Sequence, residues 1–259
     1  MQLAWMTSPE VGDCVERGSI VVVPVGATEQ HGPHLPVSTD AAIVEAVAIE
    51  AAELTGDIAA PVVSYGYNQK ELMFPGTVSA NLETLTRYLF DLCSSIRTTG
   101  FSRILILNGH GWNKPSIGAV AHMIAENGKV LCAAASYYDL ISDTLGRIRE
   151  SEYPGGMSHA GELETSIALH LFPDAVRMEK AQKDISFPKS EHFWLDISSP
   201  SAVSIPRPFR DLTRTGVIGD PTLATAEKGR SAFSAAVEAV ASLLRDLRQQ
   251  PLPGEGSRT

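Results

Sequence analysis

The chain of 259 residues has little of what would tie it to a membrane, a disulfide framework or a nucleic acid. None of its apolar runs approaches the roughly 20 residues that a membrane span needs. Its three cysteines, Cys14, Cys93 and Cys132, are odd in number and far apart, which indicates reduced thiols in a reducing compartment. The net charge of -9 argues against a nucleic-acid surface, where clustered Lys and Arg are expected.

Targeting and nucleotide-binding signals are also missing. The first residues, MQLAWMTSPEVGD, lack the basic region and the apolar region of a signal peptide, so a cytoplasmic protein is expected. No GxGxxG opens a helix and no GxxxxGK[ST] is present, so a nucleotide-binding function is unsupported. What remains, with 44% apolar and 20% charged residues, is an ordinary globular composition that can bury a large core.

Apolar runs and breakers alternate in a way that predicts strands and helices in turn. The expected strands cover 19–25, 58–63, 103–107 and 130–135, and the main expected helices cover 40–54, 81–98, 115–127 and 224–247. This order predicts the α/β fold class: a single-domain three-layer α/β/α sandwich with a mostly parallel central sheet. The domain is expected to fill 1–259, with the segment 1–18 and the tail 250–259 at its periphery.

Side chains that bind metals gather where the expected strands end. They are Glu29, His31 and Asp40 after the first strand, His110 after the third, and His159, Glu162 and Glu164 at the start of a late helix. The carboxyl ends of parallel strands meet at one edge of a sheet, where α/β proteins build their sites. Histidines with several carboxylates suit Zn²⁺, Mn²⁺ or Fe²⁺. The set is large enough for two ions, which together lower the pKa of a water between them.

Local spacing adds detail but leaves alternatives open. Glu29 and His31 are two residues apart, and in extended backbone such residues point the same way, so each can address its own metal in one cavity. His34 either takes part in the chemistry or only holds the Pro-rich loop by hydrogen bonds. Glu162 is either a ligand or a helix-start carboxylate, which the macrodipole favours, and Glu164 is expected to be structural.

Three segments of the sequence resemble the signature blocks of a known family. They are TEQHGPHLPVSTD at 28–40, NGHGWN at 108–113 and HAGELETS at 159–166, and a stretch at 213–229 is similar to the family's C-terminal block. The family is that of creatininase (creatinine amidohydrolase), and the resemblance covers almost the whole chain in the right order. It implies a single α/β domain, a dinuclear metal centre, hydrolysis of a carbon–nitrogen bond and a ring-shaped homo-oligomer, commonly a hexamer.

The resemblance also assigns roles. Glu29 and His110 would bind one metal, His31 the other, and Asp40 would bridge them. His159 matches the family histidine that transfers protons.

One position departs from the family pattern. Creatininase proper has a ligand Glu two residues after the histidine of NGH, where this chain has Trp112. Glu162 is the candidate to replace that ligand and to take part in catalysis, and Glu164 is the alternative ligand, otherwise placed outside the ligand set or at the helix start.

The implied reaction is attack of a metal-bridging hydroxide on the carbonyl of a small amide or cyclic amide. The change at Trp112 puts creatinine itself in doubt as the substrate. A formamide deformylase and a peptidase carry similar motifs, and an isomerase or epimerase could use the same site. A non-enzymatic, metal-dependent scaffold is a further alternative. The expected cofactors are two divalent ions, Zn²⁺, Mn²⁺ or Fe²⁺, and the expected partner is a small-molecule amide.

Overall fold

The computed structural model describes residues 1–126, 128–199 and 201–254. In this part of the chain four parallel strands form one sheet in the order β2-β1-β3-β4. The strands are β1 (Val21–Val25), β2 (Ile58–Ala59), β3 (Arg103–Asn108) and β4 (Leu131–Ser136). The α-helices are α1 (Ser8–Glu16), α2 (Thr39–Thr55), α3 (Leu82–Thr98), α4 (Lys114–Glu126), α5 (Ser142–Ile148), α6 (Glu162–Leu171) and α7 (Ala226–Gln249). Single 3-10 turns cover Leu3–Trp5, Gln69–Glu71, Gly111–Asn113, Asp139–Ile141, Pro173–Ala175, Met178–Lys180, Phe209–Asp211 and Pro221–Leu223.

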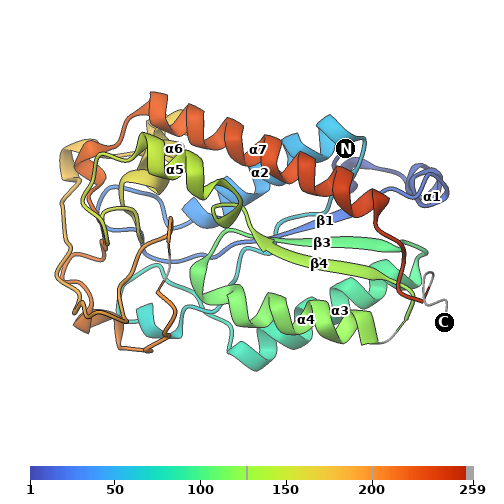
Figure 1. Cartoon of the computed structure of the whole chain (residues 1–259), viewed down its shortest axis with the longest axis horizontal. Helices are drawn as coiled ribbons and strands as arrows, with labels where there is room; N and C mark the ends of the chain where they lie inside the picture. Colours follow the sequence, from blue (N-terminus) through green and yellow to red (C-terminus); the bar gives the residue numbers. More distant parts are fainter. Residues whose placement is uncertain (127, 200, 255–259) are drawn as a thin grey trace.

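Helices cover both faces of the sheet. Figure 1 shows α2, α6 and α7 on one side of the strands and α3 and α4 on the other. Two separate apolar clusters fill the spaces between these layers. The predicted α/β class and the three-layer arrangement with a parallel sheet are therefore confirmed.

The central strands serve both layers by alternation. In β3, Leu105 and Leu107 pack under α2 and α7, while Ile104 and Ile106 face the cluster with α3 and α4. Successive side chains of a strand point to opposite faces, so a strand covered on both sides must be apolar throughout. This explains why β1 and β3 appear in the sequence as continuous apolar runs.

The second strand is shorter than the sequence predicts. The expected strand at 58–63 is observed only as Ile58–Ala59, followed by an isolated bridge between Val25 and Val63. Pro61 interrupts the run because it has no backbone N–H to donate to a neighbouring strand.

The ends of the chain differ from each other. Cys14 of α1 is fully buried, so the 1–18 segment contributes to the core as well as covering it. In the predicted peripheral tail, residues 255–259 lie outside the described residues, as does Asn127 at the end of the helix predicted at 115–127. No helix of the described part is both long and apolar enough to cross a membrane.

A close crossing fixes α7 against α6, the helix that carries part of the candidate site. A Cβ at Gly229 would lie 1.8 Å from the backbone oxygen of Ser166. The Gly229→Ala protein is expected to lose about 3 kcal/mol of unfolding free energy, since the two helices must move apart. Chemical denaturation followed by circular dichroism measures this loss.

Gly118 in α4 is the matched control. A Cβ there meets nothing within 4 Å. Gly118→Ala is therefore expected to stabilise the protein by roughly 0.5–1 kcal/mol, the usual gain of alanine over glycine inside a helix. Equal stability changes of the same sign in both variants would contradict the close crossing.

Candidate metal centre

The loop after β1 and the turn after β3 meet at the carboxyl edge of the sheet. Val25 of β1 pairs with Asn108 of β3, so the residues that follow each strand start side by side. Gly26 permits the close approach of α2, because a Cβ there would lie 2.5 Å from the Cα of Ala41. The loop containing Glu29 and the first turn of α2 are thereby brought against one another.

Asp40 lies at the middle of the cluster. Its Oδ1 is 3.0 Å from Nε2 of His31, and its Oδ2 is 2.9 Å from Nδ1 of His110. The same nitrogen of His110 is 3.0 Å from Oε1 of Glu29. The structure therefore brings together all four of these predicted residues, with Asp40 between the two histidines.

His110 is aimed by the turn that precedes it. The side chain of Asn108 accepts a hydrogen bond from the backbone N–H of His110 and donates one to its carbonyl oxygen, at 3.1 and 2.7 Å. A further bond from Asn108 to Ser136 ties this turn to the end of β4. The Asn of NGHG thus fixes the backbone that carries the histidine.

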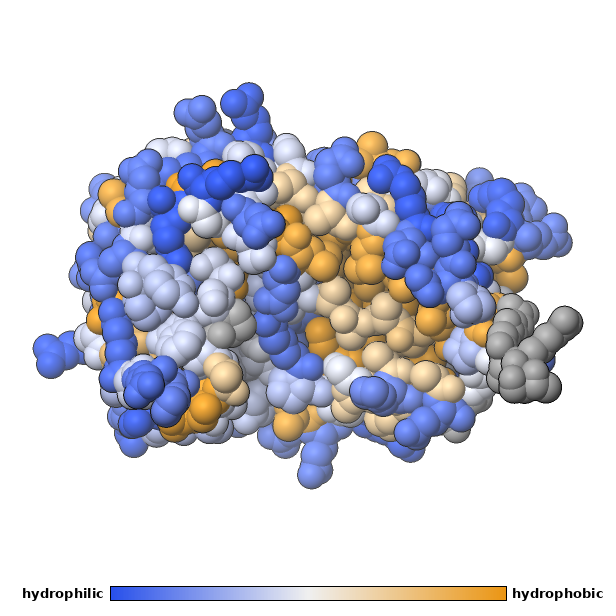
Figure 2. All heavy atoms as spheres, in the orientation of Figure 1, coloured by the Kyte–Doolittle hydropathy of each residue, from blue (hydrophilic) through white to orange (hydrophobic). Residues whose placement is uncertain are grey.

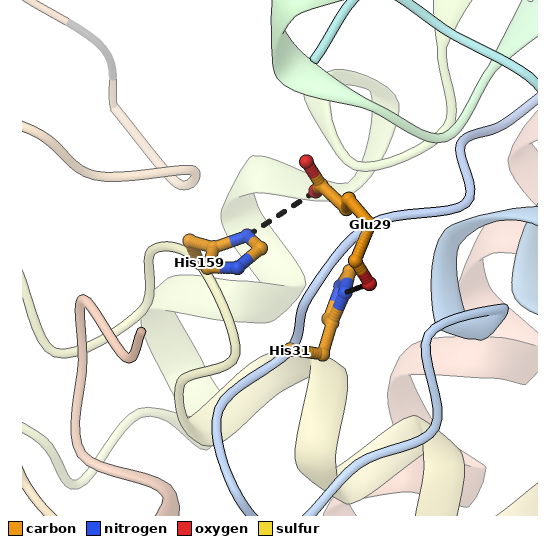
Figure 3. A group of neighbouring side chains, drawn as sticks. All are labelled: Glu29, His31 and His159. Atoms are coloured by element: carbon orange, nitrogen blue, oxygen red, sulfur yellow. Dashed lines mark hydrogen bonds and ion pairs between the residues drawn. The ribbon is translucent and has the colours of Figure 1, made fainter. Parts of the chain in front are cut away.

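His159 approaches from the turn before α6, as Figure 3 shows. Its Nδ1 lies 3.4 Å from Oε1 of Glu29, and its Nε2 contacts the side-chain nitrogen and the carbonyl oxygen of Gln30 at 2.8 and 2.9 Å. The amide of Gln30 is itself held, because it donates to Gly216 and accepts from Gly32. Gln30 therefore orients the imidazole while Nδ1 faces the cluster.

Of the two carboxylates in HAGELE, the structure brings Glu164 to the cluster and not Glu162. Oε2 of Glu164 lies 3.8 Å from Nε2 of His31 and accepts a hydrogen bond from the backbone N–H of Ala160. Glu162 instead faces α7, where it binds the Nζ of Lys228 at 2.5 Å and accepts from the N–H of Ser151. The expectation that Glu162 is the additional ligand and a catalytic group is not supported by these contacts.

Buried carboxylates outnumber the positively charged groups in the cluster, and this imbalance shifts the pKa values of its members. Burial raises the pKa of Glu29 well above its usual range, and neighbouring carboxylates raise it further. Burial opposes protonation of His31, but Asp40 and Glu164 outweigh it and raise the pKa of His31 to about 9. Burial by itself would raise the pKa of Asp40, but His31 and His110 outweigh burial and hold this pKa well below its usual value. Burial and the charge of His31 lower the pKa of His159 to about 4.

These side chains fit a pair of cations. Both carboxylate oxygens of Glu29 are buried and have no hydrogen-bond donor in the described chain. Such orphaned acceptors are rare in folded proteins unless an ion or water satisfies them. Ligand atoms within 4.8 Å of one another occur in three groups: Glu29, Asp40 and His110; His31, Asp40 and Glu164; and Glu29, His31 and His159. Imidazole with carboxylate is the donor set of Zn²⁺, Mn²⁺ or Fe²⁺.

A cavity of about 390 Å³ opens onto the cluster. Its floor includes Glu29, His110, His159 and Glu164. Its walls are mainly apolar and come from the irregular segment at 193–218: Phe193, Trp194, Ile197, Val203, Ile205, Phe209, Leu212 and Ile218. The loop at 65–75 contributes no lining residue among those described. Trp112 does line the cavity.

His34 belongs to the scaffold. Its Nε2 contacts the hydroxyl of Thr165 at 2.9 Å, which links the first loop to α6. Of the two readings left open by the sequence, this contact supports the one in which His34 holds the loop.

Two residues near the cluster were not anticipated. Gln30 lies between two predicted ligands, Glu29 and His31. In extended backbone its side chain is expected to point to the opposite side from theirs, so the sequence pattern does not indicate a contact with His159. Glu71 is fully buried in a loop without periodicity, and no sequence signal marks it.

Comparison with known proteins identifies the family of the chain. A sequence model of creatininase, described as creatinine amidohydrolase, matches residues 4–244. The chain belongs to the creatininase family.

Several curated relatives are hydrolases. The mycofactocin precursor peptide peptidase of Mycobacterium tuberculosis is 32% identical over 234 residues, covering 84% of this chain and 81% of the relative. The 3-dehydro-scyllo-inosose hydrolase of Thermotoga maritima is 28% identical over 266 residues, covering 95% and 83%. The creatinine amidohydrolase of Pseudomonas putida is 28% identical over 255 residues, covering 91% and 90%.

Similar solved structures include a creatinine amidohydrolase with a TM-score of 0.78 at 27% identity, covering 95% of this chain and 96% of that one. A Zn-Zn form of a creatininase mutant and a manganese form have TM-scores of 0.79 and 0.78. The predicted family and the predicted enzyme class, a hydrolase of carbon–nitrogen bonds, are confirmed.

The pair of Glu162 with Lys228 gives a prediction about stability. Glu162 is fully buried, and its pKa is lowered because Lys228 and the N–H groups of Ser151 and Glu150 outweigh the effect of burial. Glu162→Gln is expected to cost about 3 kcal/mol at pH 7, the usual penalty for breaking a buried ion pair. Denaturant unfolding of both proteins measures the difference.

The pH dependence of that difference has a definite sign. A carboxylate with a lowered pKa in the folded state stabilises above its unfolded pKa of about 4.3, and this contribution disappears as the pH falls through the folded pKa. The gap between wild type and Glu162→Gln should therefore shrink in acid. A gap that is constant from pH 7 to pH 3 would contradict this account of Glu162.

Proposed function

We propose that this hydrolase holds two divalent cations at the edge of its sheet, one at Glu29, Asp40 and His110 and the other at His31, Asp40 and Glu164. The observation that carries the proposal is the position of Asp40. Its two oxygens face different histidines at 3.0 and 2.9 Å, as a bridging carboxylate requires. Zn²⁺, Mn²⁺ and Fe²⁺ all suit these ligands.

When bound, the cations would polarise the scissile carbonyl and make a water molecule nucleophilic near neutral pH. The chain's own contribution to the reaction is a placed proton carrier. His159 is neutral at pH 7, since its pKa is lowered to about 4, and its Nδ1 faces the floor of the cavity. When Nε2–H donates to the carbonyl oxygen of Gln30 at 2.9 Å, Nδ1 carries the lone pair, so it can accept a proton there and deliver it to the leaving nitrogen. The same hydrogen bond keeps the ring from turning away.

The walls of the cavity favour an apolar group beside the scissile amide. Aromatic and aliphatic side chains dominate, and among the described lining residues the only Lys or Arg is Lys114. Lys114 is already paired with Asp139 at 2.8 Å. A phosphorylated substrate is bound by clusters of Arg and Lys, so the cavity suits an uncharged amide or a peptide with an apolar side chain better.

We further propose a cytoplasmic homo-oligomer, with a hexamer as the expected form. The outer edge of β4 carries no further strand in the described chain, and 131–135 stay half-buried. Figure 2 shows apolar atoms gathered over this edge. An exposed apolar strand edge is normally covered by a partner.

Metal analysis tests the ligand assignment. Asp40→Asn is expected to lose both cations because it removes the shared ligand, and Glu164→Gln is expected to lose the one at His31. Inductively coupled plasma mass spectrometry on dialysed protein gives the stoichiometry. Glu162→Gln, two residues away in the same helix turn, is the control and should keep both. Two cations per chain in Asp40→Asn would contradict the assignment.

A substrate screen tests the reaction. Cyclic amides, formamides and short peptides are offered to the metal-loaded enzyme, and the new amine is measured; apolar peptides or amides are expected to be cleaved. His159→Asn should keep its cations and lower kcat by about 10²–10⁴, the usual contribution of a proton-transfer group. Conversion of a substrate without formation of an amine or uptake of water would favour an isomerase.

A further inference from the structure

One buried carboxylate next to the cluster has no role in the function proposed so far. Glu71 is 0% exposed and lies in the loop between β2 and α3. Its loop contacts the cluster, because the carbonyl oxygen of Tyr67 lies 3.3 Å from Nε2 of His110. Burial and then the charge of Glu71 are the largest causes that raise the pKa of Glu29. The same charge acts on His110 and His159. Glu71 is therefore part of the electrostatic environment of the centre.

The position of Glu71 is fixed by its surroundings. The indole N–H of Trp112 donates to its Oε1 at 3.0 Å. Its backbone N–H bonds to Asn68, a buried residue whose side chain donates to the carbonyl of Val78 at 2.8 Å. The ammonium of Lys70 lies 3.8 Å from the centre of the Trp112 ring. Trp112 occupies the position at which creatininase carries a ligand Glu. In this chain the residue at that position instead donates a hydrogen bond to the carboxylate of Glu71.

Among the described residues, the only basic groups within 4.0 Å of the Glu29 carboxylate are the imidazoles of His110 and His159. Oε2 of Glu71 and both oxygens of Glu29 have no hydrogen-bond donor, although all three are buried. No ion pair within 4.0 Å joins Glu71 to a Lys, Arg or His among the described residues. Trp112 is the one donor to Glu71, and buried carboxylates with so few donors are unfavourable unless a positive charge is added.

We propose that Glu71, oriented by Trp112, is a further carboxylate of the cation centre whose charge strengthens binding of the cation at Glu29 and His110. The proposal rests on the proposed function, since it assumes that this site binds a cation. The replacement of the family's Glu by Trp112 then does two things. It moves one ligand to Glu164 on the side of His31, and it supplies the N–H that orients Glu71 on the side of Glu29.

The test measures cation affinity in the full-length protein after removal of metal. Zn²⁺ and Mn²⁺ are titrated separately by calorimetry into wild type and Glu71→Gln, a change that keeps an acceptor for Trp112. Affinity at one of the two sites should fall by about 10- to 100-fold, as for other carboxylates around metal sites. The melting temperature of the metal-free protein should not fall, because one of several crowded negative charges has been removed.

Two further variants separate charge from packing. Glu71→Asp keeps the charge and should bind more tightly than Glu71→Gln, while Glu238→Gln, an exposed position on α7, should match wild type. Unchanged affinity in Glu71→Gln, or equal weakening in Glu71→Gln and Glu71→Asp, would overturn the proposal. If wild type itself bound no cation, the proposed function would fail instead, so the two failures are distinguishable.

Discussion

The contact on which the rest of the structure depends is the carboxylate of Asp40 between His31 and His110. It joins the loop after β1, the first turn of α2 and the turn after β3, three segments that are brought together only when the sheet is formed. Asp40 is almost fully buried, and it stays ionised there because two imidazoles face it. The site is therefore a consequence of the fold. It also lowers the stability of the fold, since it gathers like charges in a buried position.

The fold meets this cost with contacts outside the ligand set. Glu162 and Lys228 fasten α6 to α7 and hold the backbone at Ser151, and Gly229 lets the two helices approach to contact distance. Gln30 orients His159 from the opposite side. These residues are outside the proposed ligand set. Each of them nevertheless restricts the movement of a side chain whose position at the site must be maintained.

The sequence predicted the layers, and it gathered the candidate ligands at one edge of the sheet, for a simple reason. Apolar runs that end at glycine identify buried strands, and polar residues that follow such strands must meet at one edge. It left Glu162 and Glu164 as alternatives because both carboxylates fit the family resemblance. Residues two apart in a helix point roughly 200° away from each other, so one had to face the cluster and the other α7. Which of them does so depends on the position of Lys228, 66 residues further along the chain.

Glu71 could not be predicted for a different reason. Its loop has neither helical nor strand periodicity, so the direction of its side chain is set entirely by Trp112 and Asn68. The apolar wall of the cavity has the same origin in an irregular segment, 193–218. The loops that carry the cluster and the irregular segment that forms the cavity wall are held in place in different ways. The loops after β1 and β3 are positioned by the sheet, whereas the wall of the cavity is held by its own packing of Phe187, Phe209, Leu212 and Ile218. The relatives of this chain accordingly carry names as different as precursor peptide peptidase, creatinine amidohydrolase and 3-dehydro-scyllo-inosose hydrolase.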